Sequence, residues 1–235
     1  MVAGGAILAL DTATSGAVVG IGDAAGRVRC EVTWAAGHRH GEELLARIVA
    51  ALADVGLRRD ELSGIVAGTG PGAFTGLRIG LATAKTIAHE LGVPIVGVST
   101  ALALAQAAIA RGARPPVAVL LPVGPSGMVV VELEHVGAEG TLNAASPRLV
   151  SGSDPGLAPG VTRLAVDLDG RVDLAAERLG RIARAGLAAS LIALGAARLA
   201  RGERDDVARL VPEYASLPRG VAAASGTVSW SLDRR

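Results

Sequence analysis

Aromatic residues are nearly missing from this sequence: Phe, Trp and Tyr make up 2% of 235 residues, with Phe74 the single Phe and Tyr214 the single Tyr. Hydrophobic residues still account for 50% of the chain, and Ala, Val, Leu and Ile supply most of them. Such a composition is typical of a compact protein whose core packs closely without large aromatic anchors.

The sequence also contains little cysteine, and its net charge is small. The single Cys30 excludes an intramolecular disulfide and a metal site made of several cysteines. The formal net charge is +1, so the chain has no basic excess with which to bind a polyanion by itself. If its function involves a nucleic acid, we expect partner molecules to supply much of the positive charge.

Long hydrophobic runs are missing as well. The N-terminus lacks the basic region, the apolar stretch and the cleavage site of a signal peptide. The longest apolar run near the C-terminus, residues 185–197, ends at Arg198 and is too short to span a bilayer. We therefore expect a cytoplasmic protein without a membrane partner.

The first half of the sequence predicts a mixed α/β sheet. Residues 6–10, 17–23 and 26–34 are apolar or alternating segments joined by short turns, which predicts an antiparallel meander of three strands. The pattern then alternates between helical and extended periods, which predicts parallel strands added to the meander. The predicted elements are a helix over 40–56, a strand over 64–68, a helix over 75–91, a strand over 94–99 and a helix over 101–112.

The second half predicts a smaller unit of similar topology. Strands are predicted over 117–121, 127–136 and 161–167, loops over 137–162, and one long helix over 181–202. The predicted organisation is a first lobe of residues 1–110 plus roughly 186–211, a second lobe of residues 111–185, and an irregular tail over 212–235.

The glycine-rich stretch GTGPGAFTGLRIG (68–80) is the first candidate for chemistry. It lacks the Gly-Lys pair of a phosphate loop, and Thr75 stands where a G-x-G-x-x-G motif needs its last glycine. No acid follows the next strand, as a dinucleotide site would require. A structural role fits better, since Gly70-Pro71-Gly72 predicts a turn and Thr75 can cap the helix that follows.

The helix after this turn carries a ridge of small residues. Gly76, Gly80, Ala84 and Ala88 recur every four residues. A glycine inside a helix costs about 1 kcal/mol relative to alanine, and the close approach of another element is the usual compensation. We expect the ridge to pack against the core and also against a partner.

Three polar clusters leave alternatives open. Asp11 opens the turn DTATSG, where its carboxylate could orient a metal-bound water or a phosphate, or bond the backbone of its own turn. The cluster HRH (38–40) lacks a third metal ligand nearby and predicts a solvated loop and helix start. Asp167 and Asp169 could form a pair of catalytic carboxylates, although a polar turn explains them equally well.

Three segments together resemble the TsaB family of bacterial tRNA threonylcarbamoyladenosine biosynthesis proteins, which was formerly grouped with the M22-like glycoproteases. They are ILALDTATSGAVVGI, HGEELLARI and IVAGTGPGAFTGLRIGLATAKTIAHELGVPIVGVSTALALA, within residues 6 to about 108. VPEYA near the C-terminus is weakly similar to the family's closing P-x-Y segment. The resemblance implies a two-lobed actin-like, sugar-kinase-like (ribonuclease H-like) α/β fold with mixed sheets and a reduced second lobe.

The resemblance also implies a function. TsaB proteins are non-catalytic subunits required for threonylcarbamoyl transfer to N6 of an anticodon-loop adenosine of tRNA. They bind the catalytic paralogue TsaD and, with it, the ATPase TsaE. For this chain the resemblance implies no cofactor of its own, ATP and a metal on the partner subunits, contact with tRNA through the complex, and a homodimer when the chain is alone.

The catalytic paralogue shares the glycine-rich block but carries two metal-binding histidines after the following strand. Here the corresponding segment, VSTALALAQ (98–106), contains neither histidine nor acid, so it cannot hold that metal. The segment Leu120–Gly127 is a further departure, because Leu121 and Pro122 stand where relatives carry an acid. This departure argues against a substrate or nucleotide role between the lobes.

The family resemblance predicts that the helices over 40–56 and 75–91 form a bundle with the same helices of a partner. The interface residues that it implies are His40, Leu44, Ile48, Phe74, Gly76, Arg78, Ile79, Gly80 and Lys85. Asp11 and Thr12 are candidates for a vestigial nucleotide site, and no metal site is predicted. The alternatives are a nucleotide-dependent phosphotransferase of the same fold, with Asp11 as its key residue, or an M22-like peptidase, for which no nucleophile–base pair is visible.

Overall fold

A computed structural model describes residues 5–35, 40–123, 126–136 and 141–214 of the chain. The first two residues of the cluster HRH (38–40), the side chain of His40 and the predicted tail from residue 215 onward lie outside the described residues.

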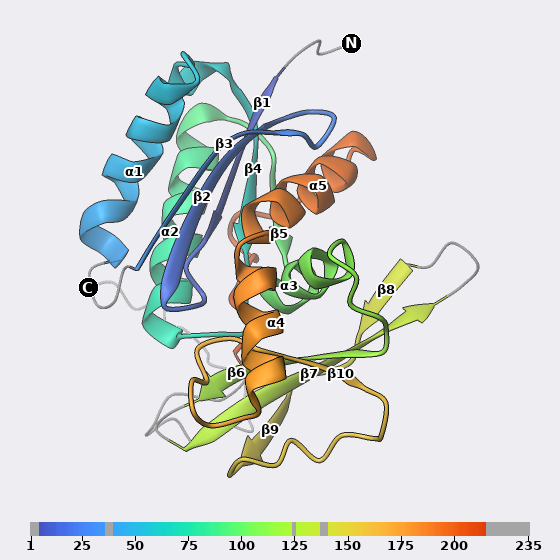
Figure 1. Cartoon of the computed structure of the whole chain (residues 1–235). Coiled ribbons are helices and arrows are strands. Elements are labelled where there is room, and N and C mark those ends of the chain that lie inside the picture. The colour runs from blue at the N-terminus through green and yellow to red at the C-terminus, as the bar shows by residue number, and fades with distance from the viewer. Residues whose placement is uncertain (1–4, 36–39, 124–125, 137–140, 215–235) are drawn as a thin grey trace, which may run out of the picture.

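The first lobe is built on a five-stranded mixed sheet with the strand order β3-β2-β1-β4-β5 (Figure 1). The predicted meander is present, with β1 pairing antiparallel to β2, and β2 to β3. β4 pairs parallel to β1, and β5 parallel to β4. The strands are β1 (Ala6–Asp11), β2 (Gly16–Asp23), β3 (Val28–Ala35), β4 (Leu62–Gly68) and β5 (Ile95–Val98).

Helices cover both faces of this sheet (Figure 1). α1 (His40–Asp54) and α2 (Phe74–Leu91) share a cluster of buried residues with Leu8 and Leu10 of β1. α3 (Thr100–Ile109) and α5 (Leu187–Ala200) share another cluster with Ile7 and Ala9. Because side chains alternate along a strand, β1 is apolar at every position before Asp11. A short 3-10 helix, η1 (Arg59–Glu61), precedes β4.

The second lobe contains a sheet with the order β10-β6-β7-β8, in which β9 also pairs with β7. β6 pairs antiparallel to β7 and parallel to β10, as β1 pairs with β2 and β4 in the first lobe. The predicted two-lobed α/β fold with similar topologies and a reduced second lobe is therefore confirmed. The strands are β6 (Val117–Val123), β7 (Gly127–Val136), β8 (Thr141–Ala144), β9 (Arg148–Ser151) and β10 (Thr162–Ala165).

The prediction of loops over 137–162 was wrong, because β8 and β9 both lie there. The single helix predicted over 181–202 was also wrong. Two helices, α4 (Leu174–Arg184) and α5, meet there at an angle of 57°. The break lies at Gly186, where a Cβ would overlap Nη1 of Arg111 and lie 3.1 Å from the Cβ of Ala107 in α3.

In the segment Leu120–Gly127, residues 120–123 are the end of β6 and Gly127 is the start of β7. Leu120 and Leu121 are buried on opposite sides of the second sheet, and Pro122 is opposite Met128 in the register. The departure from the family pattern at these positions thus serves the packing of the sheet. Among the described residues, no single helix is long and apolar enough to cross a membrane; only the bent pair of α4 and α5 passes that test jointly.

Candidate functional site

The glycine-rich stretch forms the turn from β4 into α2. Gly70 has a φ of 102°, which suits glycine alone. Its N–H donates to Oγ1 of Thr100 at 3.0 Å, and its carbonyl accepts from the N–H of Thr100 at 2.7 Å. The predicted helix cap was wrong: Ala73 is the N-cap of α2, without a side-chain bond, and Thr75 already lies in the first turn.

Asp11 is buried at the end of β1, where three loops meet. One carboxylate oxygen accepts from the N–H of Ala13 at 2.8 Å and the other from the hydroxyl of Thr100 at 2.6 Å. A Cβ on Gly68 would overlap this carboxylate. Burial raises the pKa of Asp11, and these two hydrogen bonds lower it again in part. Both oxygens thus have donors from the chain itself, which is a structural role for Asp11.

Thr12 connects the turn after β1 to α2. Its hydroxyl donates to the carbonyl of Gly76 at 2.6 Å, and a Cβ on Gly80 would overlap the same hydroxyl. All four residues of the predicted small ridge on α2 are buried. The ridge therefore faces the chain's own first lobe, where its glycines give Thr12 the room it occupies.

Several of the interface residues implied by the resemblance lie inside the lobe. Leu44 and Ile48 of α1 are buried against the first sheet, with 1% and 5% of their surface exposed. Ile79 is partly buried beside them, and its Cδ1 is the atom nearest to the position that a Cβ of Gly41 would take. These three side chains hold α1 and α2 on the sheet.

The solvent-facing side of α1 is itself apolar. Leu45 and Val49 are 57% and 67% exposed, one helical turn apart. Ala46, Ala50 and Ala53 are exposed on the same helix. A helix that is apolar nearly all round is usually covered on every side. Sequence reasoning counted Leu45 with Leu44 and Ile48 in one apolar stripe and missed Val49, although the spacing of four residues between Leu45 and Val49 was readable.

Phe74, Arg78 and Tyr214 form a cluster at the start of α2. The ring of Tyr214 lies 5.1 Å from that of Phe74, and the guanidinium of Arg78 lies 4.4 Å from the centre of the Phe74 ring. Nε of Arg78 donates to the Tyr214 hydroxyl at 3.2 Å. Tyr214 is 38% exposed. The chain's single Phe and single Tyr thus meet at the surface, although 140 residues separate them in the sequence.

Tyr214 is presented by the C-terminal strap, the name used here for residues 203–214. The strap contains no helix or strand, but it is hydrogen-bonded along its length. Lys85 of α2 donates to the carbonyl of Leu210 at 3.1 Å. Glu213 donates its N–H to the carbonyl of Thr69 and accepts the Thr69 hydroxyl, at 2.7 and 2.6 Å.

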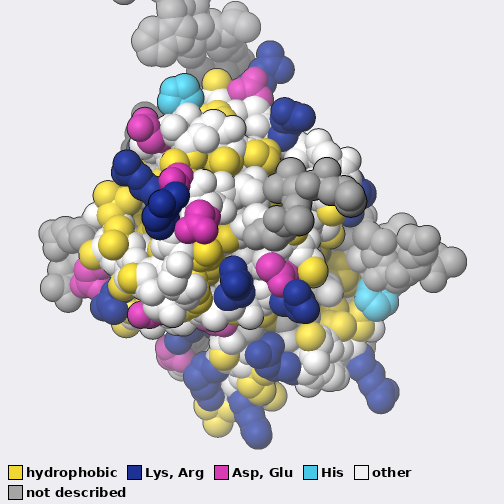
Figure 2. All heavy atoms as spheres, turned by 90° about the horizontal axis from the view of Figure 1, so that it is seen from above, with side chains coloured by type: hydrophobic (Ala, Val, Ile, Leu, Met, Phe, Trp, Pro, Cys, Tyr) yellow, Lys and Arg dark blue, Asp and Glu magenta, His cyan; other side chains and the backbone are white. Residues whose placement is uncertain are grey.

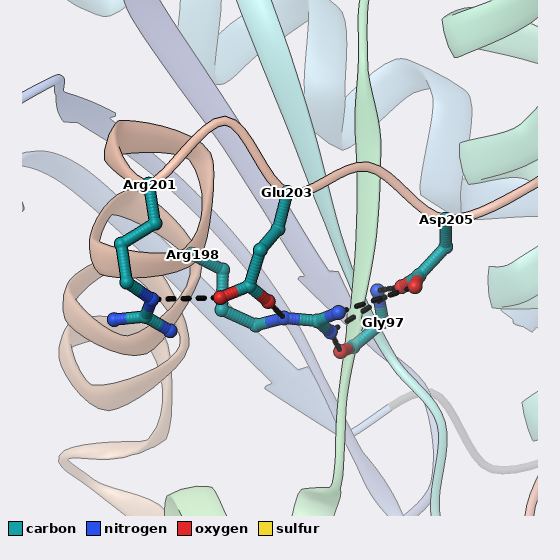
Figure 3. A network of polar contacts seen from close by, with 5 residues as sticks. All are labelled: Gly97, Arg198, Arg201, Glu203 and Asp205. Carbon is teal, nitrogen blue, oxygen red and sulfur yellow. Dashed lines mark hydrogen bonds and ion pairs between the residues drawn. The ribbon is translucent and has the colours of Figure 1, made fainter.

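Arg198, near the end of α5, holds the beginning of the strap (Figure 3). Its guanidinium donates to Glu203 at 2.7 Å, to Asp205 at 3.1 Å and to the carbonyl of Gly97 in β5. Asp205 in turn accepts the N–H of Gly97 at 2.7 Å. Hydrogen bonds from Arg198 and Arg201 lower the pKa of Glu203.

A groove of about 490 Å³ runs between α2 and the strap. It is lined by Arg78, Leu81, Ala82, Lys85, Thr86, Leu210, Val211, Pro212 and Tyr214. Seen from above, charged side chains of both signs lie among hydrophobic ones over the face of the molecule (Figure 2). The candidate site consists of the exposed side of α1, the start of α2 and the strap, which combine apolar and charged side chains.

Comparison with known proteins places these features in a family. Residues 34–161, which include α1, α2 and the glycine-rich turn, match the family described as TsaD, tRNA N6-adenosine threonylcarbamoyltransferase. The chain belongs to the TsaD family. TsaB proteins are among its relatives, which confirms the resemblance seen in the sequence.

Two curated relatives of this TsaD family chain illustrate the similarity. An uncharacterized protein of Mycobacterium tuberculosis is 41% identical over 99 residues, 39% of this chain and 44% of that protein. The tRNA threonylcarbamoyladenosine biosynthesis protein TsaB of Escherichia coli is 33% identical over 103 residues, 43% of each chain. The chain thus spans less than half the length of the curated relatives it matches.

A solved structure shows the same fold. YeaZ from Pseudomonas aeruginosa has a TM-score of 0.70 with 23% identity, over 88% of this chain and 98% of that one. The likeness therefore extends over both lobes, beyond the segment in which the curated sequences match.

Proposed function

We propose that this TsaD family chain is the TsaB-type, non-catalytic subunit of the machinery that places a threonylcarbamoyl group on N6 of an anticodon-loop adenosine of tRNA. It would act by binding a TsaD-type catalytic subunit and, with it, TsaE, and it would meet tRNA through that complex. The family match and the similarity to TsaB of Escherichia coli support this proposal.

The observation that carries the proposal is the apolar outer side of α1. Leu45 and Val49 leave more than half of their surface in water although the inner side of the same helix is fully packed. Contiguous exposed apolar surface is typical of protein–protein contacts. Two helices already lie side by side here, α1 and α2, so a helix pair of a partner can complete a four-helix arrangement.

The cluster of Phe74, Arg78 and Tyr214 is a second candidate region for contact with the partner. Aromatic and arginine side chains are the residues that most often dominate binding energy at interfaces, and Phe74, Arg78 and Tyr214 stand together at one end of α2. In the absence of a TsaD-type partner, a second copy of the chain presents the same helices, so we expect a homodimer with the same face covered.

The absence of a catalytic role rests on the state of Asp11. Its carboxylate accepts from Ala13 and Thr100 and is buried, so it serves the junction of β1, β4 and α3. Tight binding of ATP and magnesium by the isolated chain, measured by calorimetry, would contradict this part of the proposal and favour a phosphotransferase.

Charge substitutions on α1 test the proposed surface. Leu45→Glu and Val49→Glu place a carboxylate in the apolar contact, and both side chains point to solvent, so the fold should persist. Leu174→Glu is the matched control, because Leu174 is 77% exposed on α4 of the second lobe. Each variant is mixed with the TsaD and TsaE proteins of the same organism, and complex mass and threonylcarbamoyl transfer to tRNA are measured.

We expect both α1 variants to lose the complex and the transfer activity by at least about tenfold, which corresponds to about 1.4 kcal/mol. The Leu174 variant should behave like the wild type. If the α1 variants assemble and support transfer normally while folded, the partner binds elsewhere and the proposed surface is wrong.

A further inference from the structure

Asp167, directly after β10, has an unusual backbone. Its φ is 58°, and it is the one non-glycine residue with a positive φ among the described parts of the chain. Asp and Asn occupy this left-handed region more readily than most residues, but at some cost in energy. Such a conformation persists when surrounding contacts hold it, and the contacts of the Asp167 side chain come from both lobes.

The carboxylate of Asp167 reaches the turn between β1 and β2. Ser15 donates its backbone N–H to Oδ2 and its hydroxyl to Oδ1, both at 2.6 Å. Arg184, the last residue of α4, donates Nη1 to Oδ1 of Asp167 at 3.0 Å and to Oγ of Ser15 at 3.3 Å. Only 16% of the Asp167 side chain is exposed.

A backbone N–H, a hydroxyl and a guanidinium that converge on one point are the donors with which proteins bind oxyanions. Here they come from both lobes: Ser15 belongs to the first and Arg184 to the second. These donor groups of Ser15 and Arg184 could bind a carboxylate that is not part of the chain, because the hydrogen bonds would be the same with a free carboxylate or phosphate.

We propose that Ser15 and Arg184 form an oxyanion-binding site between the lobes, and that Asp167 fills this site from within the chain and latches the lobes together. In the wild type the turn after β1 is therefore closed to anionic ligands. When the Asp167 side chain is removed, the same donors take up a small free oxyanion. This inference is independent of the proposed function.

The surroundings indicate what kind of anion fits. A cavity of about 60 Å³ adjoins the latch and is lined by Asp169, Glu177, Arg181 and Arg184 besides Asp167. Glu177 is buried and accepts the N–H of Gly170 at 2.7 Å. Without Asp167, the negative charges of the two acids and the positive charges of the two arginines around this cavity cancel. A singly charged carboxylate such as formate should therefore bind better than the more highly charged inorganic phosphate.

Asp167→Gly is the first test, because glycine adopts a positive φ without strain and leaves the site empty. Thermal unfolding is followed in about 100 mM sodium formate, phosphate or chloride at equal ionic strength. A ligand that binds only the folded state raises the unfolding temperature. We expect formate to raise the unfolding temperature of Asp167→Gly by about 3 °C relative to chloride. Phosphate should raise it less. The unfolding temperature of the wild type should shift by less than about 1 °C.

The controls use residues of the same helix. Adding Arg184→Met to Asp167→Gly should abolish the response to formate, whereas adding Arg178→Met, an exposed residue of α4, should leave it unchanged. The proposal is overturned if the wild type responds as strongly as Asp167→Gly, or if the folded variant responds to neither anion.

Asp167→Asn serves if the glycine variant does not fold. It keeps the size of the side chain and tolerates the backbone conformation, but it loses the charge that Arg184 and Ser15 bind. Hydrogen exchange of the Ser15 amide should then become at least about tenfold faster than in the wild type. Unchanged exchange would mean that the carboxylate does not latch the turn.

Discussion

Thr12 and Gly80 are in direct contact across the first lobe. The Thr12 hydroxyl, which donates to the carbonyl of Gly76 at 2.6 Å, lies where a side chain at position 80 would begin. The contact fixes the start of α2 to the end of β1, and it explains why a glycine stands in the middle of an 18-residue helix.

Gly80→Ala should therefore destabilise the protein in spite of the better helix propensity of alanine. Overpacking of a filled site typically costs about 1–3 kcal/mol, against a gain of up to about 1 kcal/mol from propensity. Denaturant unfolding measures the net loss. Gly41→Ala on α1 is the control, since the nearest atom to its Cβ would lie at an ordinary contact distance of 3.9 Å; it should be neutral or slightly stabilising.

A double variant separates the Thr12 contact from other effects at position 80. Thr12→Ala removes the hydroxyl that a Cβ on residue 80 would overlap, so the combined loss of Thr12→Ala and Gly80→Ala should be smaller than the sum of the single losses. Strictly additive free energies of unfolding would show that residue 80 is constrained by something else.

Tyr214 should hold the end of the strap on α2. Tyr214→Ala removes the ring contact with Phe74 and the hydrogen bond from Arg78, whereas Tyr214→Phe removes only the hydrogen bond. Since an aromatic pair contributes about 0.5–1.5 kcal/mol beyond burial, limited proteolysis within residues 205–214 should be several-fold faster for the Ala variant and nearly unchanged for the Phe variant. Equal proteolysis of all three proteins would argue against this anchoring.

Arg198 should stabilise the strap more than Arg201 does. Arg198→Met removes the donor to the carbonyl of Gly97 and leaves Asp205 with the N–H of Gly97, in a partly buried place, which should cost about 1–3 kcal/mol. Arg201 is 61% exposed, and within the described part of the chain its guanidinium bonds Glu203 alone, so Arg201→Met should leave the unfolding midpoint unchanged. Equal midpoints for the two variants would contradict the network as described.

Asp11 should make the protein less stable as the pH rises from 3.8, the ordinary pKa of its side chain. Because burial raises the pKa of Asp11 above that value in the folded state, the folded chain binds more protons than the unfolded chain between the two pKa values, and stability falls with rising pH there. Asp11→Asn removes this dependence. The free energy of unfolding of Asp11→Asn minus that of the wild type should therefore increase as the pH rises through this range, and then level off.

A pH-independent difference between Asp11→Asn and the wild type would show that the carboxylate is not protonated more readily in the folded state. Urea unfolding at constant ionic strength from pH 3.5 upward measures this difference directly.

The elements of the first lobe were predictable because local pattern and final environment agree there. β1 is apolar at each position before Asp11, and the structure buries all of those positions. The helix over 75–91 was predicted to within one residue of α2, since the turn before it and Gly92 after it are local signals. Glycine at position 92 has a φ of 63°, as expected after a helix end.

The features that the sequence did not predict depend on contacts between residues far apart in the chain. Nothing in the sequence near Gly186 distinguishes it from a glycine tolerated inside a helix; its close neighbours in the structure, Arg111 and Ala107, are far from it in the sequence. The family resemblance implied Leu44 and Ile48 as interface residues, whereas in the structure the chain's own sheet buries both side chains. The pairing of Ser15 with Asp167 spans 152 residues and has no local signal.

The hydrogen bonds between Asp205 and β5 also affect the tendency of the protein to aggregate. β5 is the last strand of the first sheet, and Asp205 occupies its free side by donating to the carbonyl of Ile95 and accepting from the N–H of Gly97. An uncovered strand edge is a template for aggregation. The strap therefore protects the solubility of the first lobe, and a chain truncated before residue 203 would expose the β5 edge to edge-to-edge pairing with its copies.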